Sequence, residues 1–202
     1  MKTIYISKSH PLRANAETHI KNIYQKNYDA VIHDFPNMLV ATVNHNNEIS
    51  CAAGIRSQST GFFSEIYLAK PLESLIAQKA KCPVARQDVL EIVSLAGNSP
   101  ITSLILLNFM ISHARQAGKK WGLFTATSKL RAMIIRAGLP LIILAPANSN
   151  KVENANSWGR YYESDPWVCA LHDGKSNPLS FILEKRQRPA VEFIKKSSAI
   201  NE

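Results

Sequence analysis

The sequence lacks an apolar run long enough to cross a lipid bilayer. Its longest apolar runs, Leu139–Ala147 and Leu104–Leu107, fall far short of the roughly 20 residues that a membrane-spanning helix needs. The first residues also make a poor secretory signal, because Ser7 and Lys8 interrupt the apolar segment within a few positions. We therefore expect no transmembrane segment, while contact with a membrane surface stays open.

Cysteine is also scarce. The chain has three cysteines, Cys51, Cys82 and Cys169, which is an odd number, and none of them belongs to a C-x-x-C pair. This pattern is typical of free thiols in a reducing compartment, so we expect the protein in the cytoplasm. Burial among apolar neighbours is the simplest account of the three side chains.

Several catalytic motifs are missing as well. The sequence has no H-E-x-x-H, no C-x-x-C and no G-x-x-x-x-G-K-[ST], so zinc hydrolysis and P-loop chemistry lack support. The G-x-S-x-G motif of the usual esterases and phospholipases is also absent. We expect no metal site.

Acidic residues are outnumbered by basic ones. The chain has 15 Asp and Glu against 24 Lys and Arg, which gives a formal net charge of +9 and a pI near 9.6. This balance indicates an anionic partner, and acidic carrier protein, coenzyme, nucleic acid and anionic membrane all carry the right charge. Charge alone does not choose among them.

The composition indicates one globular unit followed by a charged tail. Hydrophobic residues make up 46% of the 202 residues and charged residues 19%, which is typical of a chain with a substantial core. After Gly174, six Lys or Arg stand against three Glu, and the segment has no strong periodic pattern. We interpret residues 1–172 as one domain and residues 173–202 as a basic carboxyl-terminal tail.

Hydrophobic periodicity is clearest between Asp88 and Ala147, where it predicts the order β-turn-α-β-α-β. A helix that starts directly after a strand is where α/β proteins commonly bind the phosphate-bearing end of a ligand. The predicted elements are a strand at Val89–Leu95, a turn at Ala96–Pro100, a helix at Ile101–Ala117, a strand at Gly122–Thr127, a helix at Ser128–Ala137 and a strand at Leu141–Ala145.

An antiparallel hairpin is predicted ahead of this unit. Its strands are Met38–Val43 and Ile49–Arg56, and the asparagine-rich stretch Asn44–Asn47 suits the positive φ of a hairpin turn. The strands and helices together predict an α/β (α+β) fold. The remaining predicted elements are a strand at Lys2–Ser7, a helix at Leu12–Tyr28, an extended segment at Phe62–Leu68, a helix at Leu72–Lys81 and a polar loop at Asn148–Ser157.

Two segments are distinctive, Trp121–Leu130, which contains FTAT, and Trp158–Tyr162, which reads WGRYY. These two and four further segments resemble the bacterial thermostable haemolysin family. The order of elements resembles the fold of GCN5-related N-acetyltransferases and acyl-homoserine-lactone synthases. The resemblance runs from about residue 10 to residue 172 and implies a mixed sheet flanked by helices and an acyl-transfer activity. The other four segments are Tyr24–Pro36, Glu65–Leu75, Glu91–Asn98 and Leu144–Ala147.

Glu91 is the candidate general base. It stands in the otherwise apolar strand Val89–Leu95, where burial would raise its pKa. A thioester is already activated, so acyl transfer needs a group that takes the proton from an attacking amine, and the resemblance implies this role for Glu91. The alternative is an exposed glutamate on the wet face of the strand, or one paired with Arg56 or Arg86.

The acyl donor is predicted to bind along the same strand and the turn after it. The resemblance implies that backbone amides around Val93 and Leu95 polarise the thioester carbonyl where the strand is splayed. The turn offers further amides at Gly97, Asn98 and Ser99. It has one glycine and no preceding Arg or Gln, unlike the Gly-x-Gly or Gly-x-Ala pattern of acetyltransferases. A phosphopantetheine arm with one phosphodiester therefore makes fewer demands on it than the pyrophosphate of coenzyme A.

Further site residues come from the second half of the chain. Thr125 and Thr127 share a face and would hydrogen-bond the pantetheine amides or the acceptor, although threonine in a strand needs no function to explain it. Arg131 would belong to a basic rim for phosphate or carrier protein, with a solvated helix face as the alternative. The resemblance implies that Tyr161 or Tyr162 protonates the leaving thiolate.

The predicted function is acyl transfer from acyl carrier protein or acyl-CoA to a small amine or amino acid. We expect no tightly bound cofactor, because acyl-CoA or a phosphopantetheine-linked acyl group is a substrate, and no nucleic acid partner. The family name points to an alternative, a haemolysin-like membrane-lytic protein without enzymatic activity. For that role the basic tail offers surface attraction but no insertion segment.

Overall fold

The computed structural model describes residues 1–172, so the predicted basic tail at 173–202 lies outside the described residues. Within residues 1–172 the chain forms four α-helices and one sheet of seven strands, which confirms the predicted mixed sheet flanked by helices. The strands are β1 (Lys2–Ile6), β2 (Met38–Val43), β3 (Ile49–Ser57), β4 (Val89–Gly97), β5 (Trp121–Ala126), β6 (Leu141–Pro146) and β7 (Trp167–His172). The helices are α1 (Arg13–Tyr28), α2 (Leu72–Ala80), α3 (Pro100–Gln116) and α4 (Ser128–Arg136).

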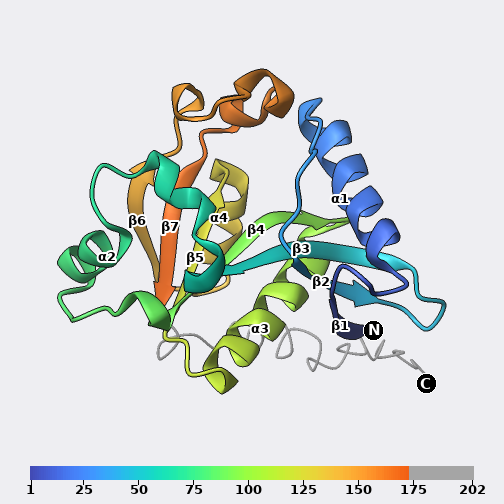
Figure 1. Ribbon diagram of the computed structural model, residues 1–202, viewed down its shortest axis with the longest axis horizontal. Helices are drawn as coiled ribbons and strands as arrows, with labels where there is room; N and C mark the ends of the chain where they lie inside the picture. The colour runs from blue at the N-terminus through green and yellow to red at the C-terminus, as the bar shows by residue number, and fades with distance from the viewer. Residues whose placement is uncertain (173–202) are drawn as a thin grey trace, which may run out of the picture.

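The sheet is twisted and splayed at its centre (Figure 1). Its strand order is β1-β2-β3-β4-β5-β7-β6, and all neighbours are antiparallel except β4 and β5. The parallel pairing covers only Val89–Ile92 against Trp121–Phe124, although β4 continues to Gly97 alongside β3. The two central strands therefore diverge after Ile92.

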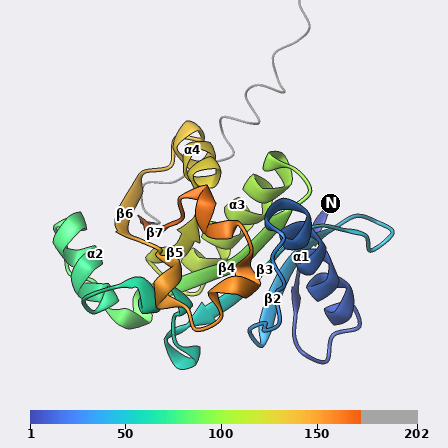
Figure 2. The same ribbon diagram turned by 90° about the horizontal axis from the view of Figure 1, so that it is seen from above.

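Helices cover both faces of the sheet (Figures 1 and 2). On one face, Leu106 of α3 and Ile134 of α4 pack in the same core cluster. On the other face, Ile20 of α1 packs over β2 and β3, and Ile76 of α2 packs over β5 and β7. Between α1 and α2 lies a 3-10 helix, η2 (Phe63–Tyr67), which hydrogen-bonds to side chains of β4 and β5. The centre of this face is thus left to short, irregular segments.

Helix α3 begins at the turn after β4, as its sequence predicts. Pro100 stands in the first turn, where its missing N–H costs nothing, and the Ser99 hydroxyl accepts a hydrogen bond from the Thr102 N–H at 3.3 Å. The Thr102 hydroxyl accepts in return from the Ser99 N–H at 3.1 Å. Across the residues that the structure describes, no helix has the combined length and apolar character of a membrane span.

Two segments differ from the sequence prediction. Phe62–Leu68 is predicted to be extended, and this is wrong, because η2 occupies most of it. The backbone N–H groups of Phe63 and Ser64 donate to the Glu91 carboxylate, so a side chain far along the chain fixes this conformation. The second difference is β7, which the sequence pattern does not predict and which lies between β5 and β6.

Candidate active site

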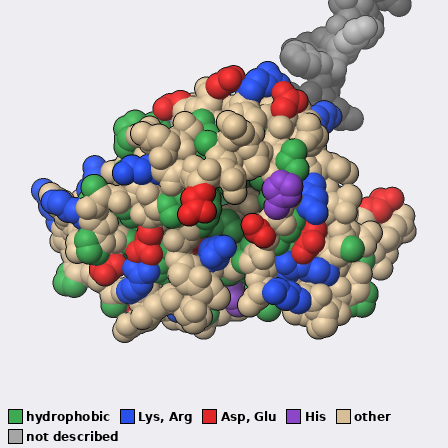
Figure 3. Space-filling view, turned by 45° about the horizontal axis from the view of Figure 1, so that its top comes forward, with side chains coloured by type: hydrophobic (Ala, Val, Ile, Leu, Met, Phe, Trp, Pro, Cys, Tyr) green, Lys and Arg blue, Asp and Glu red, His purple; other side chains and the backbone are tan. Residues whose placement is uncertain are grey.

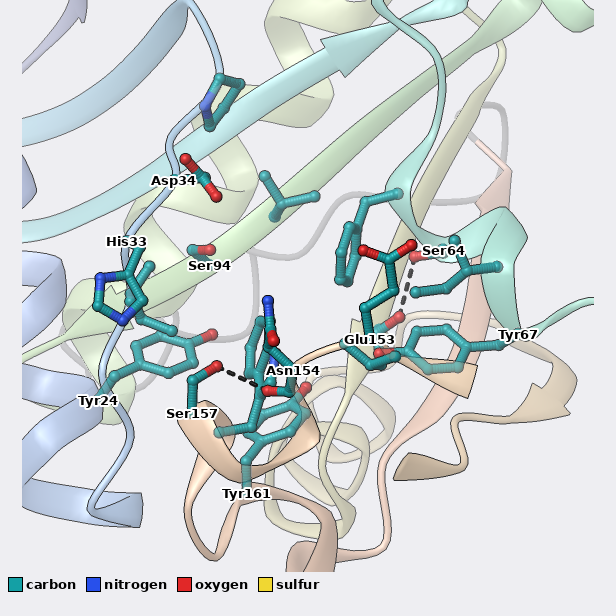
Figure 4. Close-up of a pocket in the computed structure, with 18 of the residues that line it drawn as sticks. Tyr24, His33, Asp34, Ser64, Tyr67, Ser94, Glu153, Asn154, Ser157 and Tyr161 are labelled. Atoms are coloured by element: carbon teal, nitrogen blue, oxygen red, sulfur yellow. Dashed lines mark hydrogen bonds between the residues drawn. The ribbon is translucent and has the colours of Figure 1, made fainter. Parts of the chain in front are cut away.

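A pocket of about 400 Å³ lies where β4 and β5 diverge. Ile92–Ser94 of β4 and Thr125 of β5 line it together with residues of η2. Figure 3 shows a hollow on this side of the molecule, with acidic, basic and histidine side chains at its margin. Figure 4 shows how the segment before β2, η2 and the loop after β6 converge on the pocket.

Strand β4 has a bulge at this pocket. The register with β3 shifts between Ala52 and Gly54, so Ser94 and Leu95 stand opposite a single residue of β3. Ser94 has a φ of 52°, in the left-handed region that non-glycine residues seldom adopt. Val93 and Ser94 line the pocket, whereas Leu95 packs against the core on the opposite face. Bulges of this kind re-aim the backbone beside functional sites.

The Glu91 side chain is buried beneath η2, with an exposed fraction of 0%. Both carboxylate oxygens accept hydrogen bonds, from the Phe63 N–H at 2.6 Å and from the Ser64 N–H at 2.8 Å. Burial raises the pKa of Glu91 above its ordinary value of 4.5, while hydrogen bonds from Ser64 and Phe63 and the nearby Arg56 oppose the rise. The exposed alternative for Glu91 is therefore excluded.

A pair of hydroxyl groups joins Glu91 to the pocket. The Ser64 side chain lies near enough to the Glu91 carboxylate to lower its pKa, and the Ser64 Oγ lies 2.9 Å from the Oγ1 of Thr125. Ser64 and Thr125 both line the pocket, whereas Glu91 does not. These two hydroxyls therefore lie between the pocket and Glu91.

Aromatic rings form another wall of the pocket. Tyr161 is buried, lines the pocket and lies in ring contact with Tyr24 and Trp158. The hydroxyl of Tyr162 lies 2.8 Å from the hydroxyl of Tyr67, which lines the pocket. Burial raises the pKa of Tyr161 and of Tyr162, so both phenols stay protonated at neutral pH and are able to donate a proton.

Residues 157–160, here called the strap, fasten the rim of the pocket to the end of α1 (Figures 1 and 2). The Arg160 N–H donates to the Tyr28 carbonyl at 2.7 Å, and the Arg160 guanidinium pairs with Asp29 at 2.9 Å. Gly159 has a φ of 49°, and a Cβ at this position would lie 2.2 Å from the Tyr28 carbonyl oxygen. The glycine of WGRYY is thus required by a close backbone approach.

Five of the six segments that carry the sequence resemblance contribute residues to this pocket; Leu144–Ala147 does not. The sequence model of the family described as thermostable hemolysin matches residues 6–176. The chain belongs to the thermostable hemolysin family. No curated protein matches it.

Solved structures similar to this thermostable hemolysin family member include two synthases and an acetyltransferase. The acyl-homoserine-lactone synthase LasI is 12% identical, with a TM-score of 0.56 over 85% of this chain and 90% of its own. FeeM, an N-acyl amino acid synthase from uncultured soil microbes, is 11% identical, with a TM-score of 0.55 over 89% and 99%. A putative N-acetyltransferase from Lactobacillus plantarum is 10% identical, with a TM-score of 0.54 over 85% and 97%. These likenesses confirm the predicted fold.

The turn after β4 is not part of the pocket in this thermostable hemolysin family member. Gly97, Asn98 and Ser99 do not line it. The Asn98 N–H donates to the Ser50 carbonyl at 3.0 Å and the Ser99 N–H to the Thr102 hydroxyl at 3.1 Å. A Cβ at Gly97 would lie 2.3 Å from a serine hydroxyl of α3, so side chains of the cap fill this corner. Phosphate binding at the turn stays a prediction, and it would require these amides to exchange partners.

The three residues of the second half that are predicted to bind the acyl donor separate in space. Thr125 lies in the pocket, as its predicted role requires, but Thr127 and Arg131 do not line it. Thr127 caps α4 by accepting from the Leu130 N–H at 3.4 Å. Arg131 pairs with Asp165 at 2.6 Å. Both side chains thus have structural partners, and their roles in donor binding stay predictions.

Sequence reasoning missed most of the charged residues at the pocket. It gave Arg56 only as a partner for Glu91, and Arg86, the other predicted partner, instead pairs with Glu65. For His33 and Asp34, the only sequence signal is their place in Tyr24–Pro36, one of the segments that carry the family resemblance. The missed residues with acidic, basic or histidine side chains are His33, Asp34, Lys151 and Glu153.

Proposed function

We propose that this protein is an N-acyltransferase that moves an acyl group from acyl carrier protein or acyl-CoA to a small amine or amino acid. The observation that carries the proposal is the buried carboxylate of Glu91, joined through Ser64 and Thr125 to a pocket at the divergence of β4 and β5. The fold shared with an acyl-homoserine-lactone synthase and an N-acyl amino acid synthase supports the same class of reaction.

The proposed reaction begins when the amine nitrogen attacks the carbonyl carbon of the thioester. The new C–N bond forms, the C–S bond breaks, and the thiolate leaves with the bonding electrons. The amine loses one proton, which passes through the Thr125 and Ser64 hydroxyls to Glu91. A positioned base of this kind typically contributes about 10²- to 10⁴-fold to the rate.

The thioester arm is proposed to lie against β4. Beyond Ile92, no strand within residues 1–172 pairs with the edge of β4 that faces β5, so the backbone groups of this edge suit the amides of a pantetheine arm. The bulge at Ser94 then places the backbone of Val93 and Ser94 at the pocket, where an N–H group would stabilise the negative charge that develops on the carbonyl oxygen.

Replacement of Tyr161 by phenylalanine is expected to lower the turnover number about 10²-fold, the lower end of general acid catalysis. The reason is that Tyr161 lines the pocket as a protonated phenol, which would give its proton to the leaving thiolate. Steady-state rates of Tyr161→Phe, Tyr162→Phe and Tyr67→Phe check this. If Tyr162 is the acid and acts through Tyr67, those two variants lose activity together, and full activity in all three variants would contradict a tyrosine acid.

The experiment that tests the proposed function measures thiol release. Purified protein is incubated with acyl-CoA or with acyl carrier protein bearing the same acyl chain, in the presence and absence of a pool of amines and amino acids. N-acyl transfer predicts thiol release that depends on the pool. Equal release with and without the pool would mean thioester hydrolysis and would contradict the proposal.

The family description favours a second candidate, a membrane-lytic protein without enzymatic activity. Lysis of erythrocytes by detergent-free protein separates the two candidates. Direct lysis predicts that Glu91→Gln protein lyses cells as fast as the unchanged protein. If lysis is lost together with acyl transfer, an acylated, surfactant-like product causes it.

A further inference from the structure

Arg56 is a half-buried cation in the pocket with an incomplete set of partners. It lines the pocket from β3, and its Nε is enclosed without a hydrogen-bond partner among the described residues. Its Nη1 donates to the Thr60 carbonyl over 3.4 Å, which is long for a hydrogen bond. Enclosed donors without acceptors are rare in folded proteins because they are destabilising. A hydrogen-bond acceptor bound in the pocket would therefore complete the set of partners of the Arg56 guanidinium.

The carboxylates nearby do not supply that acceptor. Arg56 stands directly opposite Glu91 in the β3–β4 register, but both Glu91 oxygens accept from backbone N–H groups of η2. Asp34 and Glu153 line the pocket as exposed residues, and neither pairs with Arg56. The two Nη groups of a guanidinium form a fork that matches the two oxygens of one carboxylate, and in Arg56 this end, unlike the enclosed Nε, is the part that a carboxylate in the pocket can reach.

We propose that Arg56 binds the carboxylate of the acceptor, and that the acceptor is an amino acid rather than a simple amine. This inference rests on the proposed N-acyl transfer. Side chains opposite each other on neighbouring strands lie close together. A carboxylate held by Arg56 therefore brings an amine on the adjacent carbon towards the hydroxyls of Ser64 and Thr125 that lead to Glu91.

The test compares acceptors that differ only by a carboxylate. Leucine is paired with 3-methylbutylamine, phenylalanine with 2-phenylethylamine, and serine with ethanolamine. For each pair, kcat/KM is measured with the unchanged protein, Arg56→Gln and Arg56→Lys. We expect the amino acid to be preferred, and Arg56→Gln to lower that preference about 10²-fold, the scale of a hydrogen bond to a charged group. The preference of Arg56→Lys should fall between those of the unchanged protein and of Arg56→Gln. The lysine ammonium keeps the positive charge but lacks the paired N–H groups of a guanidinium.

The ratio within a pair distinguishes carboxylate binding from any other role of Arg56. Loss of the Arg56 charge also raises the pKa of Glu91, but that change affects both members of a pair alike. An unchanged ratio in Arg56→Gln would overturn the inference. Equal use of amines and amino acids by the unchanged protein would overturn it too, and would leave N-acyl transfer standing.

Failure of the proposed function is distinguishable from failure of this inference. If no acceptor is acylated, the proposed function is contradicted, and equilibrium binding then decides the carboxylate site alone. Calorimetry with each amino acid and its matched amine is expected to detect amino acid binding that Arg56→Gln abolishes. Equal binding to both proteins would overturn the assignment of Arg56.

Discussion

Replacement of Glu91 by glutamine is expected to lower the turnover number of acyl transfer by about 10²- to 10⁴-fold. The amide cannot accept the proton that the attacking amine releases, and the structure offers the pocket a route to Glu91 through Ser64 and Thr125. Amine-dependent thiol release measures the effect. Thr125→Val is the matched control, because it interrupts the same route and leaves the bonds between η2 and Glu91 in place.

Glu91 also holds η2 in place through hydrogen bonds, so its replacement should change the stability of the protein as well as its turnover number. In Glu91→Gln the amide nitrogen faces a backbone N–H of Phe63 or Ser64 that formerly had an acceptor. The free energy of unfolding should therefore fall by about 1–3 kcal/mol. Thr125→Val should lose turnover with little loss of stability. If Glu91→Gln loses stability but keeps full turnover, and Thr125→Val is fully active, Glu91 is an anchor only.

The pH dependence provides a further measure of the same residue. Because burial raises the pKa of Glu91, the carboxylate that acts as base forms only above the ordinary value of 4.5. The turnover number should rise with pH through an inflection above 4.5, and Glu91→Gln should lack that inflection. Stability should change with pH in the opposite direction to turnover. Because the pKa of Glu91 is raised in the folded state, its protonation stabilises the folded state at low pH, and this stabilisation is lost as the pH rises through the folded-state pKa.

Replacement of Gly159 by alanine is expected to cost about 2–5 kcal/mol of unfolding free energy. A positive φ in a non-glycine residue costs about 1–2 kcal/mol. The added Cβ would lie 2.2 Å from the Tyr28 carbonyl oxygen and 2.7 Å from that of Asp29, and forcing atoms into a packed site costs about 1–3 kcal/mol more. Urea unfolding measures the change.

Gly118→Ala is the matched control for the strap. Gly118 also has a positive φ, of 69°, but apart from its chain neighbours no atom of residues 1–172 would lie within 4 Å of a Cβ there. The free energy of unfolding of Gly118→Ala should therefore fall only by the cost of the positive φ, about 1–2 kcal/mol. If Gly159→Ala loses no more than Gly118→Ala, the strap tolerates a side chain and the account of WGRYY is wrong. We also expect weaker acceptor binding in Gly159→Ala only, because the strap borders the pocket.

The elements with a clear hydrophobic period could be predicted from the sequence. The strand pattern of Val89–Leu95 and the helical pattern of Ile101–Ala117 correspond to β4 and α3. β7 escaped prediction because Trp167–His172 ends a segment dense in aromatic residues, which hides the alternation of a strand. The conformation of Phe62–Leu68 could not be read locally either, since it depends on hydrogen bonds to Glu91.

The site was predictable only where one residue carries the signal. Glu91 is conspicuous as a charge in an apolar strand, and Thr125 as a polar residue that alternates with apolar neighbours in the FTAT segment. Arg56 has no such signal, because its proposed role rests on an incomplete set of hydrogen-bond partners that only packing creates. The turn at Gly97 has the sequence pattern of an anion site, yet its Ser99 amide donates to the Thr102 hydroxyl in the cap of α3 and its Asn98 amide donates to the Ser50 carbonyl.

Mass spectrometry of the products shows whether the pocket between β4 and β5 joins a thioester to an amine. Purified protein is incubated with acyl carrier protein or acyl-CoA and a pool of amines and amino acids. We expect an N-acylated amino acid whose mass equals that of the acceptor plus the acyl group minus one hydrogen, and which is nearly absent with Glu91→Gln. The contrary result is consumption of the thioester, or lysis of erythrocytes, with no acylated amine in the mixture.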